Sequence, residues 1–325
     1  MGEFELIQRC FMSPQAGKGV VVGNGDDGAV LEVPTGQDLV VSIDTLVEGV
    51  HFLTGTAPEL LAARLLGAAA SDLAAMAATP AWLTLALTLP RADEPWLQAF
   101  SSALHRRCRE LGLVLVGGDT TRGPAKVLSA QVHGLVPQGQ AWQRSGAKPG
   151  DRILVTGTLG DSRAGLETLQ QPLPDGAEPE AVQQLRNRFY RPEPRLELAC
   201  QLRGAADAAI DISDGIVGDL GHILAASGVG AVLQADKLPL SSALCQLYPQ
   251  QAVDWALAGG EDFELCMAVP PEQLKRCHET ACALGIRLTE IGVITAGTGL
   301  QVQQAGGRLL HELPGSWDHF RSKDE

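Results

Sequence analysis

Basic residues are scarce in this sequence, and their shortage restricts the function it can have. Its 325 residues include 25 Lys and Arg against 38 Asp and Glu, which gives a formal net charge of −13. DNA and RNA phosphates are bound mainly by Lys and Arg, so this balance argues against a nucleic-acid partner. A phosphorylated small molecule is still compatible, because bound divalent cations can reverse the local field of an acidic site.

The sequence also lacks a membrane-spanning run and a paired-cysteine motif. Its most apolar stretch, residues 60–89, is interrupted by Arg64, Asp72 and Pro80. The N-terminal segment MGEFELIQRCF has no basic region followed by an apolar one, as a signal peptide would. The seven cysteines are scattered without a CxxC pair, which argues against a disulfide framework or a zinc site. We therefore expect a cytoplasmic protein with no membrane partner.

What the sequence does contain predicts an α/β protein of two domains. The length suits two domains, and the 45% hydrophobic residues suffice for sizeable cores. Helix-like segments at 57–78 and 95–111 alternate with strand-like segments at 81–90, 113–123 and 127–137. The Gly/Pro/Lys-rich turn at 145–151 predicts the boundary, so we expect one domain at 1–147 and the other at 148–325.

One pattern recurs along the chain: a short apolar run ends in small residues and then in acidic ones. The clusters are Gly25-Asp26-Asp27, Ser42-Ile43-Asp44, Gly117-Gly118-Asp119, Asp211-Ile212-Ser213-Asp214 and the variant Gly259-Gly260-Glu261-Asp262. Asp72 adds a carboxylate to an Ala/Leu-rich helix. Hard oxygen ligands of this kind suit Mg²⁺ and substrate phosphates. The pattern favours metal-dependent phosphoryl transfer.

Each cluster taken alone also fits a simpler explanation. Asp at a strand end is often a turn former or a helix cap, and Asp72 could face solvent. Adjacent carboxylates repel each other unless they share a cation or a proton, so five clusters together are hard to explain as surface charge. Asp219 has no second acid beside it, and we expect it on a helix surface.

The common nucleotide-binding motifs do not account for the sequence. Residues 23–28 match GxGxxG, but two aspartates inside the loop would repel a pyrophosphate, and no clear βαβ pattern follows. The P-loop motif and the protein-kinase signatures are missing. Arg122 and Arg144 could pair with phosphate oxygens or be solvated surface residues. His51 and Trp317 could contact a substrate, or serve only structure.

Taken together, the motifs resemble the thiamine-monophosphate kinases, a family of the superfamily that includes aminoimidazole ribonucleotide synthetase. The resemblance covers nearly the whole chain and rests on GDDGAVL, SIDTLVEGVHF, SDLAAM, GGDTTRGP, RSGAKPGD, VTGTLGDS, AIDISDG, GGEDFEL and WDHF. It implies two α/β domains of the aminoimidazole ribonucleotide synthetase-like fold. It also implies that N-terminal domains pair in a homodimer, with ATP and metals between the domains.

The resemblance assigns roles to individual residues. Those implied as ligands of several Mg²⁺ ions are Asp27, Ser42, Ile43, Asp44, Asp72, Asp119, Asp211 and Asp214. Gly118, Asp119, Arg144 and Ser213 are implied in ATP binding, and His51, Glu261 and Trp317 in binding thiamine monophosphate. Relatives often have Thr where this chain has Ile43, so a metal contact there must use the backbone carbonyl.

The implied reaction is transfer of a phosphoryl group from ATP to thiamine monophosphate. The acceptor phosphate, whose second pKa is about 6, is its own nucleophile, so we expect no catalytic base and no phosphoenzyme.

Two alternatives stay open. A sister enzyme of the same fold is one, although selenophosphate synthetase would need a reactive cysteine that Cys10 does not supply, and the hydrogenase-maturation relative would end in cysteine rather than RSKDE. Aminoimidazole ribonucleotide synthetase would lack the GGEDFEL and WDHF match. The other alternative is a non-catalytic metal- or nucleotide-binding regulator.

Overall fold

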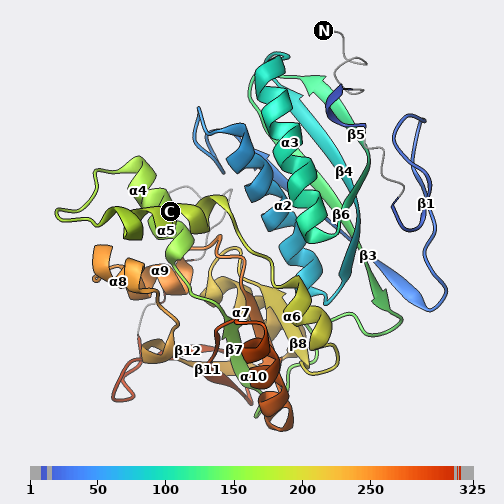
Figure 1. The fold of residues 1–325 in the computed structure, drawn as a ribbon. Coiled ribbons are helices and arrows are strands. Elements are labelled where there is room, and N and C mark those ends of the chain that lie inside the picture. Colours follow the sequence, from blue (N-terminus) through green and yellow to red (C-terminus); the bar gives the residue numbers. More distant parts are fainter. Residues whose placement is uncertain (1–8, 13–16, 311–312, 314, 316–325) are drawn as a thin grey trace. The chain divides into compact units, whose positions relative to one another are not determined.

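Two structural units, each built around one main β-sheet, make up the chain (Figure 1). The computed structural model describes residues 9–12, 17–310, 313 and 315. The first unit comprises Met1–Leu73 and Ala78–Ala141, and the second comprises Ala74–Ala77 and Trp142–Glu325. The predicted boundary after residue 147 lies close to this division and stays a prediction. Within the described residues, none of the helices is both long and apolar enough to cross a membrane.

The first unit is a four-stranded sheet with two long helices. The strand order is β3-β6-β4-β5, with β4 and β5 parallel and the other neighbours antiparallel. The bounds are β3 Gln37–Val47, β4 Thr79–Leu89, β5 Val114–Arg122 and β6 Val127–Pro137, with helices α2 Pro58–Ala75 and α3 Glu94–Leu111. A small antiparallel pair, β1 Val20–Val22 and β2 Val30–Leu31, precedes them.

Only one face of this sheet is buried. Along β6 buried residues alternate strictly with partly exposed ones, and α2 and α3 lie over the same face (Figure 1). Helix α3 begins where the Asp93 side chain accepts a hydrogen bond from the Trp96 N–H, and it ends at Gly112 in a left-handed conformation. The predicted helices 57–78 and 95–111 are confirmed to within a few residues.

Two of the acidic clusters lie inside strands, and for residues 117–119 this agrees with the predicted strand at 113–123. Ser42-Ile43-Asp44 lies inside β3, and Gly117-Gly118-Asp119 lies inside β5. The ladder with β6 continues through Asp44 to Val47, and the ladder between β4 and β5 continues to Arg122. Pairing with neighbouring strands therefore overrides the turn preference of the small and acidic residues.

The second unit has a six-stranded sheet in the order β12-β9-β11-β7-β10-β8. All neighbours are antiparallel except β12 and β9. The strands are β7 Arg152–Thr156, β8 Ala208–Asp211, β9 Gly230–Gln234, β10 Leu265–Val269, β11 Leu288–Thr295 and β12 Gly299–Gln303. Strands β8 and β10 are buried along their whole length, because helices cover both faces of the sheet.

Helices of the second unit supply three apolar clusters. Helix α7 packs on one face of the sheet with Ile153 and Ile210, and α6 and α10 pack on the other with Leu154 and Met267. Helices α4, α5 and α8 form the third cluster. The α-helices are α4 Asp161–Gln170, α5 Pro179–Tyr190, α6 Leu196–Gln201, α7 Ile216–Ser227, α8 Ser242–Leu247, α9 Ala252–Ala258 and α10 Leu274–Ala283, and the short 3-10 helices are η1 Ala235–Lys237 and η2 Pro271–Gln273.

Candidate active site

Ser42, Asp44 and Asp72 form one group in the first unit. Ser42 and Asp44 alternate along β3, so both side chains lie on the face that α2 covers, where their ladder partners Val132 and Ala130 are buried. The Ser42 hydroxyl donates a hydrogen bond to Oδ2 of Asp72, on α2, at 2.5 Å. Ile43 lies on the opposite face, and 61% of it is exposed.

Burial and charge repulsion disfavour the state in which both Asp44 and Asp72 are ionised. Burial, and then the nearby charge of Asp72, raise the pKa of Asp44 to about 7. Two carboxylates in such a place need a shared proton or a bound cation to coexist. With the Ser42 hydroxyl they offer the hard oxygen ligands that Mg²⁺ prefers.

A pocket of about 520 Å³ collects three further predicted residues in the same unit. Asp27 lies in the loop between β1 and β2, and Gly118 and Asp119 lie on β5 opposite Leu85 and Ala86 of β4. The pocket lining consists of Phe11, residues 24–29, Thr84, Leu85, Leu87 and residues 115–120. The lining is rich in glycine, and glycine allows a ligand to approach the backbone closely, which suits a ligand with phosphate groups.

Two local contacts shape the pocket. The Asn24 side-chain amide donates to the carbonyls of Phe11, at 3.0 Å, and Leu115, at 3.3 Å, which ties the β1–β2 loop to β5. A Cβ atom on Gly118 would collide with the Leu85 carbonyl oxygen. The close approach of β5 to β4 at this point therefore requires glycine.

In the second unit, the segment from Asp211 to Asp214 joins β8 to α7. Asp211 ends β8 and pairs with Leu265 of β10, and it is 5% exposed. The Ser213 and Asp214 N–H groups both donate to Oδ2 of Asp219, each at 3.0 Å. Asp219 is 2% exposed, so our prediction that it lies on a helix surface is wrong.

Glu261 lies beside this segment in an unusual backbone conformation. Its N–H donates to the Ser213 carbonyl at 2.6 Å, and the Phe263 N–H donates to the Ile212 carbonyl at 2.8 Å. Both Glu261 and Phe263 have positive φ, 59° and 51°, which is uncommon for residues other than glycine. The structure thus brings the predicted substrate residue Glu261 next to the predicted nucleotide residue Ser213.

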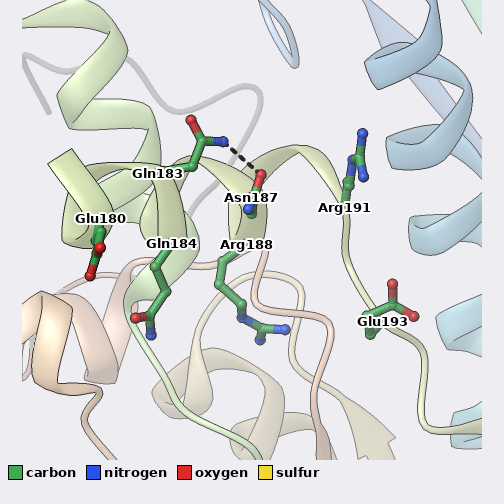
Figure 2. Close-up of a pocket in the computed structure, with 7 residues that line it drawn as sticks. All are labelled: Glu180, Gln183, Gln184, Asn187, Arg188, Arg191 and Glu193. Atoms are coloured by element: carbon green, nitrogen blue, oxygen red, sulfur yellow. Dashed lines mark hydrogen bonds between the residues drawn. The ribbon is translucent and has the colours of Figure 1, made fainter.

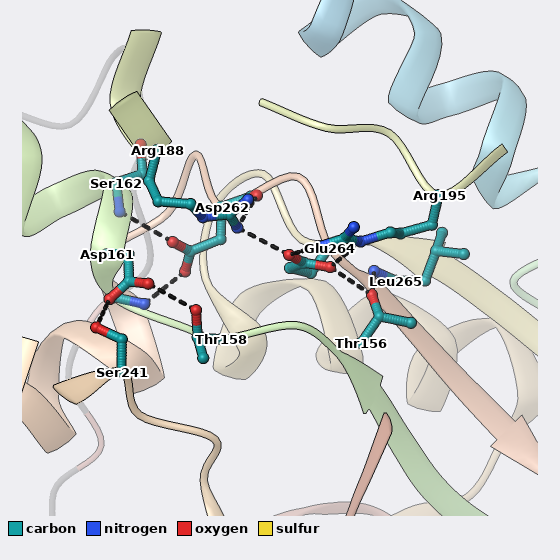
Figure 3. Close-up of polar contacts among 11 residues, drawn as sticks. Thr156, Thr158, Asp161, Ser162, Arg188, Arg195, Ser241, Asp262, Glu264 and Leu265 are labelled. Carbon is teal, nitrogen blue, oxygen red and sulfur yellow. Dashed lines mark hydrogen bonds and ion pairs between the residues drawn. The ribbon is translucent and has the colours of Figure 1, made fainter. Parts of the chain in front are cut away.

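The two acids that follow Glu261 have structural partners (Figure 3). Asp262 accepts hydrogen bonds from the Gly160 and Ser162 N–H groups, at 2.7 and 3.1 Å, and so caps the N-terminus of α4. Glu264, which is fully buried, forms ion pairs with Arg188 and Arg195 and accepts the Thr156 hydroxyl. These contacts hold the segment at Asp262, directly after Glu261, and at Glu264, directly after Phe263.

The remaining predicted contacts are placed as follows. His51 follows β3, and its Nδ1 accepts the Val47 N–H at 3.1 Å, while its carbonyl accepts Arg64 Nε. Arg144 is exposed, and its charge lowers the pKa of Asp219, against a net rise to about 7 caused mainly by burial. Trp317 lies outside the described residues.

A second hollow, of about 560 Å³, follows α5 and includes none of the predicted site residues (Figure 2). Helix α5 contributes Glu180, Gln183, Gln184, Asn187 and Arg188, and the following segment contributes Arg191 and Glu193. Gln183 and Asn187 hydrogen-bond to each other at 2.9 Å, and Arg188 is committed to Glu264. The lining of this hollow carries both acidic and basic side chains, and several of them are bonded within the protein. It therefore favours no particular class of ligand.

Comparisons with known proteins agree with this division of residues. The AIR synthase related protein N-terminal domain matches residues 25–136, and the C-terminal domain of the same family matches residues 148–304. Thiamine-monophosphate kinase from Salmonella typhimurium (strain LT2) is 48% identical over 322 residues, which cover 98% of either chain. The chain belongs to the thiamine-monophosphate kinase family.

Solved structures of this kinase family have the same fold. Thiamine-monophosphate kinase from Stenotrophomonas maltophilia K279a matches with a TM-score of 0.86 and 42% identity over 95% of this chain and 98% of that one. AaThiL complexed with AMPPCP and TMP matches with a TM-score of 0.78 and 33% identity over 98% and 97% of the two chains. The predicted family and fold are confirmed. HypE from E. coli, at 22% identity, shares the fold alone.

The predicted metal ligands of this kinase are divided between the two units. Those in the first unit are Asp27, Ser42, Ile43, Asp44, Asp72 and Asp119, and those in the second are Asp211 and Asp214. Within the described part of the chain, no three His, Cys, Asp or Glu side chains are grouped so as to hold a metal ion. The ligand set therefore stays a prediction.

Asp219 is the residue at the site that our reading of the sequence missed. Helical spacing gives the signal, because Ile216, Leu220 and Ile223 form an apolar stripe on which Asp219 also falls. An acid on the buried stripe of a helix must have polar partners. Its partners, the N–H groups of Ser213 and Asp214, precede the helix and carry no charge. A search of the sequence for neighbouring charged residues therefore does not reveal them.

Proposed function

We propose that this chain transfers the γ-phosphoryl group of ATP to thiamine monophosphate and so forms thiamine diphosphate and ADP. One observation carries the proposal: a relative that matches 98% of this chain has been solved with AMPPCP and TMP bound, AMPPCP being an analogue of ATP. Curated thiamine-monophosphate kinases that match 98% of the chain at 47–48% identity support it. The reaction serves the biosynthesis of thiamine diphosphate.

The acceptor phosphate is the nucleophile in this proposal, and transfer is direct and in line. With a second pKa of about 6 it is largely a dianion at neutral pH, so no general base is needed. The buried thiols are unsuited to forming a covalent intermediate. Burial raises the pKa of Cys108 to about 12 and that of Cys277 to about 11, so both stay protonated.

Mg²⁺ is the cation that the donor set fits. The partly buried, mutually repelling carboxylates of Asp44 and Asp72 beside the Ser42 hydroxyl support a cation there. Bound Mg²⁺ would neutralise the charge on the phosphates and align them. The residues proposed to hold it are Asp27, Ser42, the carbonyl of Ile43, Asp44, Asp72, Asp119, Asp211 and Asp214.

The protein's own groups bind and orient the two substrates. For ATP we propose the backbone at Gly118, where the chain must be glycine, together with Asp119, Arg144 and Ser213. For thiamine monophosphate we propose His51, Glu261 and Trp317. Glu261 is held firmly in place, because its own N–H donates to the Ser213 carbonyl and the next residue, Asp262, accepts the Gly160 N–H. A carboxylate there suits the cationic thiazolium or the aminopyrimidine.

We also propose that the chain is a cytoplasmic homodimer. The uncovered face of the first unit's sheet presents Leu39, Val41 and Ile43 of the edge strand β3, at 44, 48 and 61% exposure. Such an apolar row on an open sheet is typical of a protein interface. All seven cysteines are free, in keeping with a reducing compartment.

The direct test is to incubate the purified protein with ATP, Mg²⁺ and thiamine monophosphate and to measure thiamine diphosphate. Thiamine in place of its monophosphate, and EDTA in place of Mg²⁺, should both give no product. Asp44→Asn should lower turnover by orders of magnitude, whereas Asp38→Asn on the same strand should not. Near-normal turnover of Asp44→Asn at saturating Mg²⁺ would exclude the proposed metal site.

A further inference from the structure

We infer that Asp219 is a positioning residue for the nucleotide, because its carboxylate fixes the backbone of Ser213 and Asp214. The inference rests on the proposed function, which assigns ATP to Ser213 and Mg²⁺ to Asp214. Asp219 itself lies in the first turn of α7. It is not among the residues that the family resemblance implies for binding.

A single carboxylate oxygen of Asp219 holds two consecutive peptide groups. Oδ2 accepts the Ser213 N–H and the Asp214 N–H, each at 3.0 Å, and the side chain is almost completely buried. A buried N–H group that loses its acceptor is costly, so both of these N–H groups depend on this oxygen. The carboxylate therefore sets the orientation of both peptide planes.

The Ser213 residue is also held from its other side. Its carbonyl accepts the Glu261 N–H at 2.6 Å, and the Gly260 Cα lies so close that a Cβ there would meet the same carbonyl oxygen at 2.7 Å. Ser213 is thus fixed between Asp219 on α7 and the turn that presents Glu261. A change at Asp219 should first displace Ser213, which we assign to ATP binding. The displacement of Ser213 should then affect Glu261, whose N–H it accepts.

The geometry distinguishes this role from ordinary helix capping. An N-cap side chain precedes the helix and accepts N–H groups of its first turn, whereas Asp219 lies inside α7 and reaches back to residues ahead of it. Gly215, with φ 102°, makes the reversal between them. Burying a carboxylate on the apolar stripe of α7 costs stability, so its benefit must lie in the segment that it holds.

Three substitutions separate the positioning role from general stability. Asp219→Asn keeps an oxygen that can accept both N–H groups. Asp219→Glu keeps the charge but moves the oxygens by one methylene, and Asp219→Ala removes the acceptor. Asp151→Ala is the matched control, because Asp151 is also a buried carboxylate of the second unit, 3% exposed, and accepts a backbone N–H, that of Lys148, at 2.8 Å.

The experiment measures the affinity of the full chain for AMPPCP with Mg²⁺ by calorimetry, the melting temperature, and KM and kcat for ATP. We expect Asp219→Ala and Asp219→Glu to weaken AMPPCP binding and raise KM roughly tenfold or more, because the first removes and the second displaces the acceptor of two backbone hydrogen bonds. Asp219→Asn should stay within about threefold of the wild type, since its oxygen still accepts. Asp151→Ala should lower the melting temperature and leave the affinity unchanged.

Two results would overturn the inference. One is wild-type affinity in both Asp219→Glu and Asp219→Ala, and the other is an equal loss of affinity in Asp151→Ala. If Asp219→Ala does not fold, the other two variants decide. The inference then requires Asp219→Glu to bind AMPPCP more weakly than Asp219→Asn does. A wild-type chain that binds AMPPCP but makes no thiamine diphosphate would refute the proposed function, and the affinity series would still test Asp219.

Discussion

Arg195 and Glu264 form a two-pronged ion pair in the interior of the second unit, with Nε and Nη2 of the arginine at 2.6 and 2.5 Å from the two carboxylate oxygens. Arg188 adds a second guanidinium at 2.8 Å (Figure 3). Glu264 has no exposed surface, and the side chains of Arg188 and Arg195 are 18 and 19% exposed. The pair anchors the chain three residues after Glu261.

Glu264→Gln should therefore destabilise the protein strongly. It keeps the size of the side chain but leaves two guanidinium groups without their counter-charge, and breaking a buried pair in this way costs about 3–5 kcal/mol. Urea-induced unfolding followed by circular dichroism measures the change. The control is Glu279→Gln, because the Lys275–Glu279 pair is exposed and 3.8 Å long, and its loss should change little. Equal effects of the two substitutions would contradict the assigned role of Glu264.

The raised pKa of Asp44 predicts how the metal-free protein responds to pH. Its folded-state pKa of about 7 lies above the ordinary value of 3.8, so the folded state binds this proton more tightly than the unfolded chain does. The stability that this proton contributes is complete below about pH 4 and is lost as the pH rises through 7. Asp44→Asn should remove this loss, and Mg²⁺ should offset it in the wild type.

Melting temperatures in EDTA between pH 4.5 and 8, at constant ionic strength, test this prediction. Asp219 and Asp262 also have pKa values raised to about 7, mainly by burial, so the quantity to follow is the difference between wild type and Asp44→Asn. That difference should move in favour of Asp44→Asn as the pH rises. A difference that does not change with pH would show that Asp44 ionises normally.

Gly118→Ala should damage the pocket of the first unit. The new methyl group would meet the Leu85 carbonyl oxygen, so β5 must move away from β4, at a cost of about 1–3 kcal/mol or more. We expect a lower melting temperature and weaker AMPPCP binding. Gly28 lines the same pocket, but a Cβ there meets nothing within 4 Å, so Gly28→Ala is the matched control and should bind normally. Normal binding by Gly118→Ala would remove this strand from the nucleotide site.

Local sequence patterns predicted much of this fold. Helix α2 follows from its Ala/Leu-rich composition with Pro58 in the first turn, and α3 from Pro95 in its first turn. Asp44 and Asp119 lie within β3 and β5, and the ladders that hold these strands join residues far away in the sequence. Strand pairing of this kind is not encoded in the neighbouring residues.

The site was less accessible to sequence reasoning than the fold. Acidic clusters indicated metal-dependent phosphoryl transfer, but the roles of individual residues came from the family resemblance. Local patterns gave no sign that Glu261 and Phe263 adopt positive φ, or that Asp262 would cap α4, since both depend on buried partners about 50 to 100 residues away. The position of Asp219 on the apolar stripe of α7 was readable and was overlooked.

Val41→Lys should convert the proposed dimer to monomers. Val41 lies between Leu39 and Ile43 in the exposed row of β3, and its ladder partner is His133 of β6. In a symmetric contact, a lysine there would lose its hydration and face either the same lysine of the partner or an apolar surface. Burying an uncompensated charge in this way costs several kcal/mol. In the monomer the new side chain would lie in solvent. The melting temperature measured at low protein concentration should therefore hardly change.

Sedimentation equilibrium over a range of protein concentrations measures the effect. The wild type should sediment at twice the chain mass and Val41→Lys at the chain mass at the same concentration. Leu173→Lys is the control, because Leu173 has a similar exposure of 44% but belongs to the second unit, outside the row on β3. A monomeric wild type would refute the proposed dimer, and a Val41→Lys variant that stays dimeric would place the interface elsewhere than on this face of the sheet.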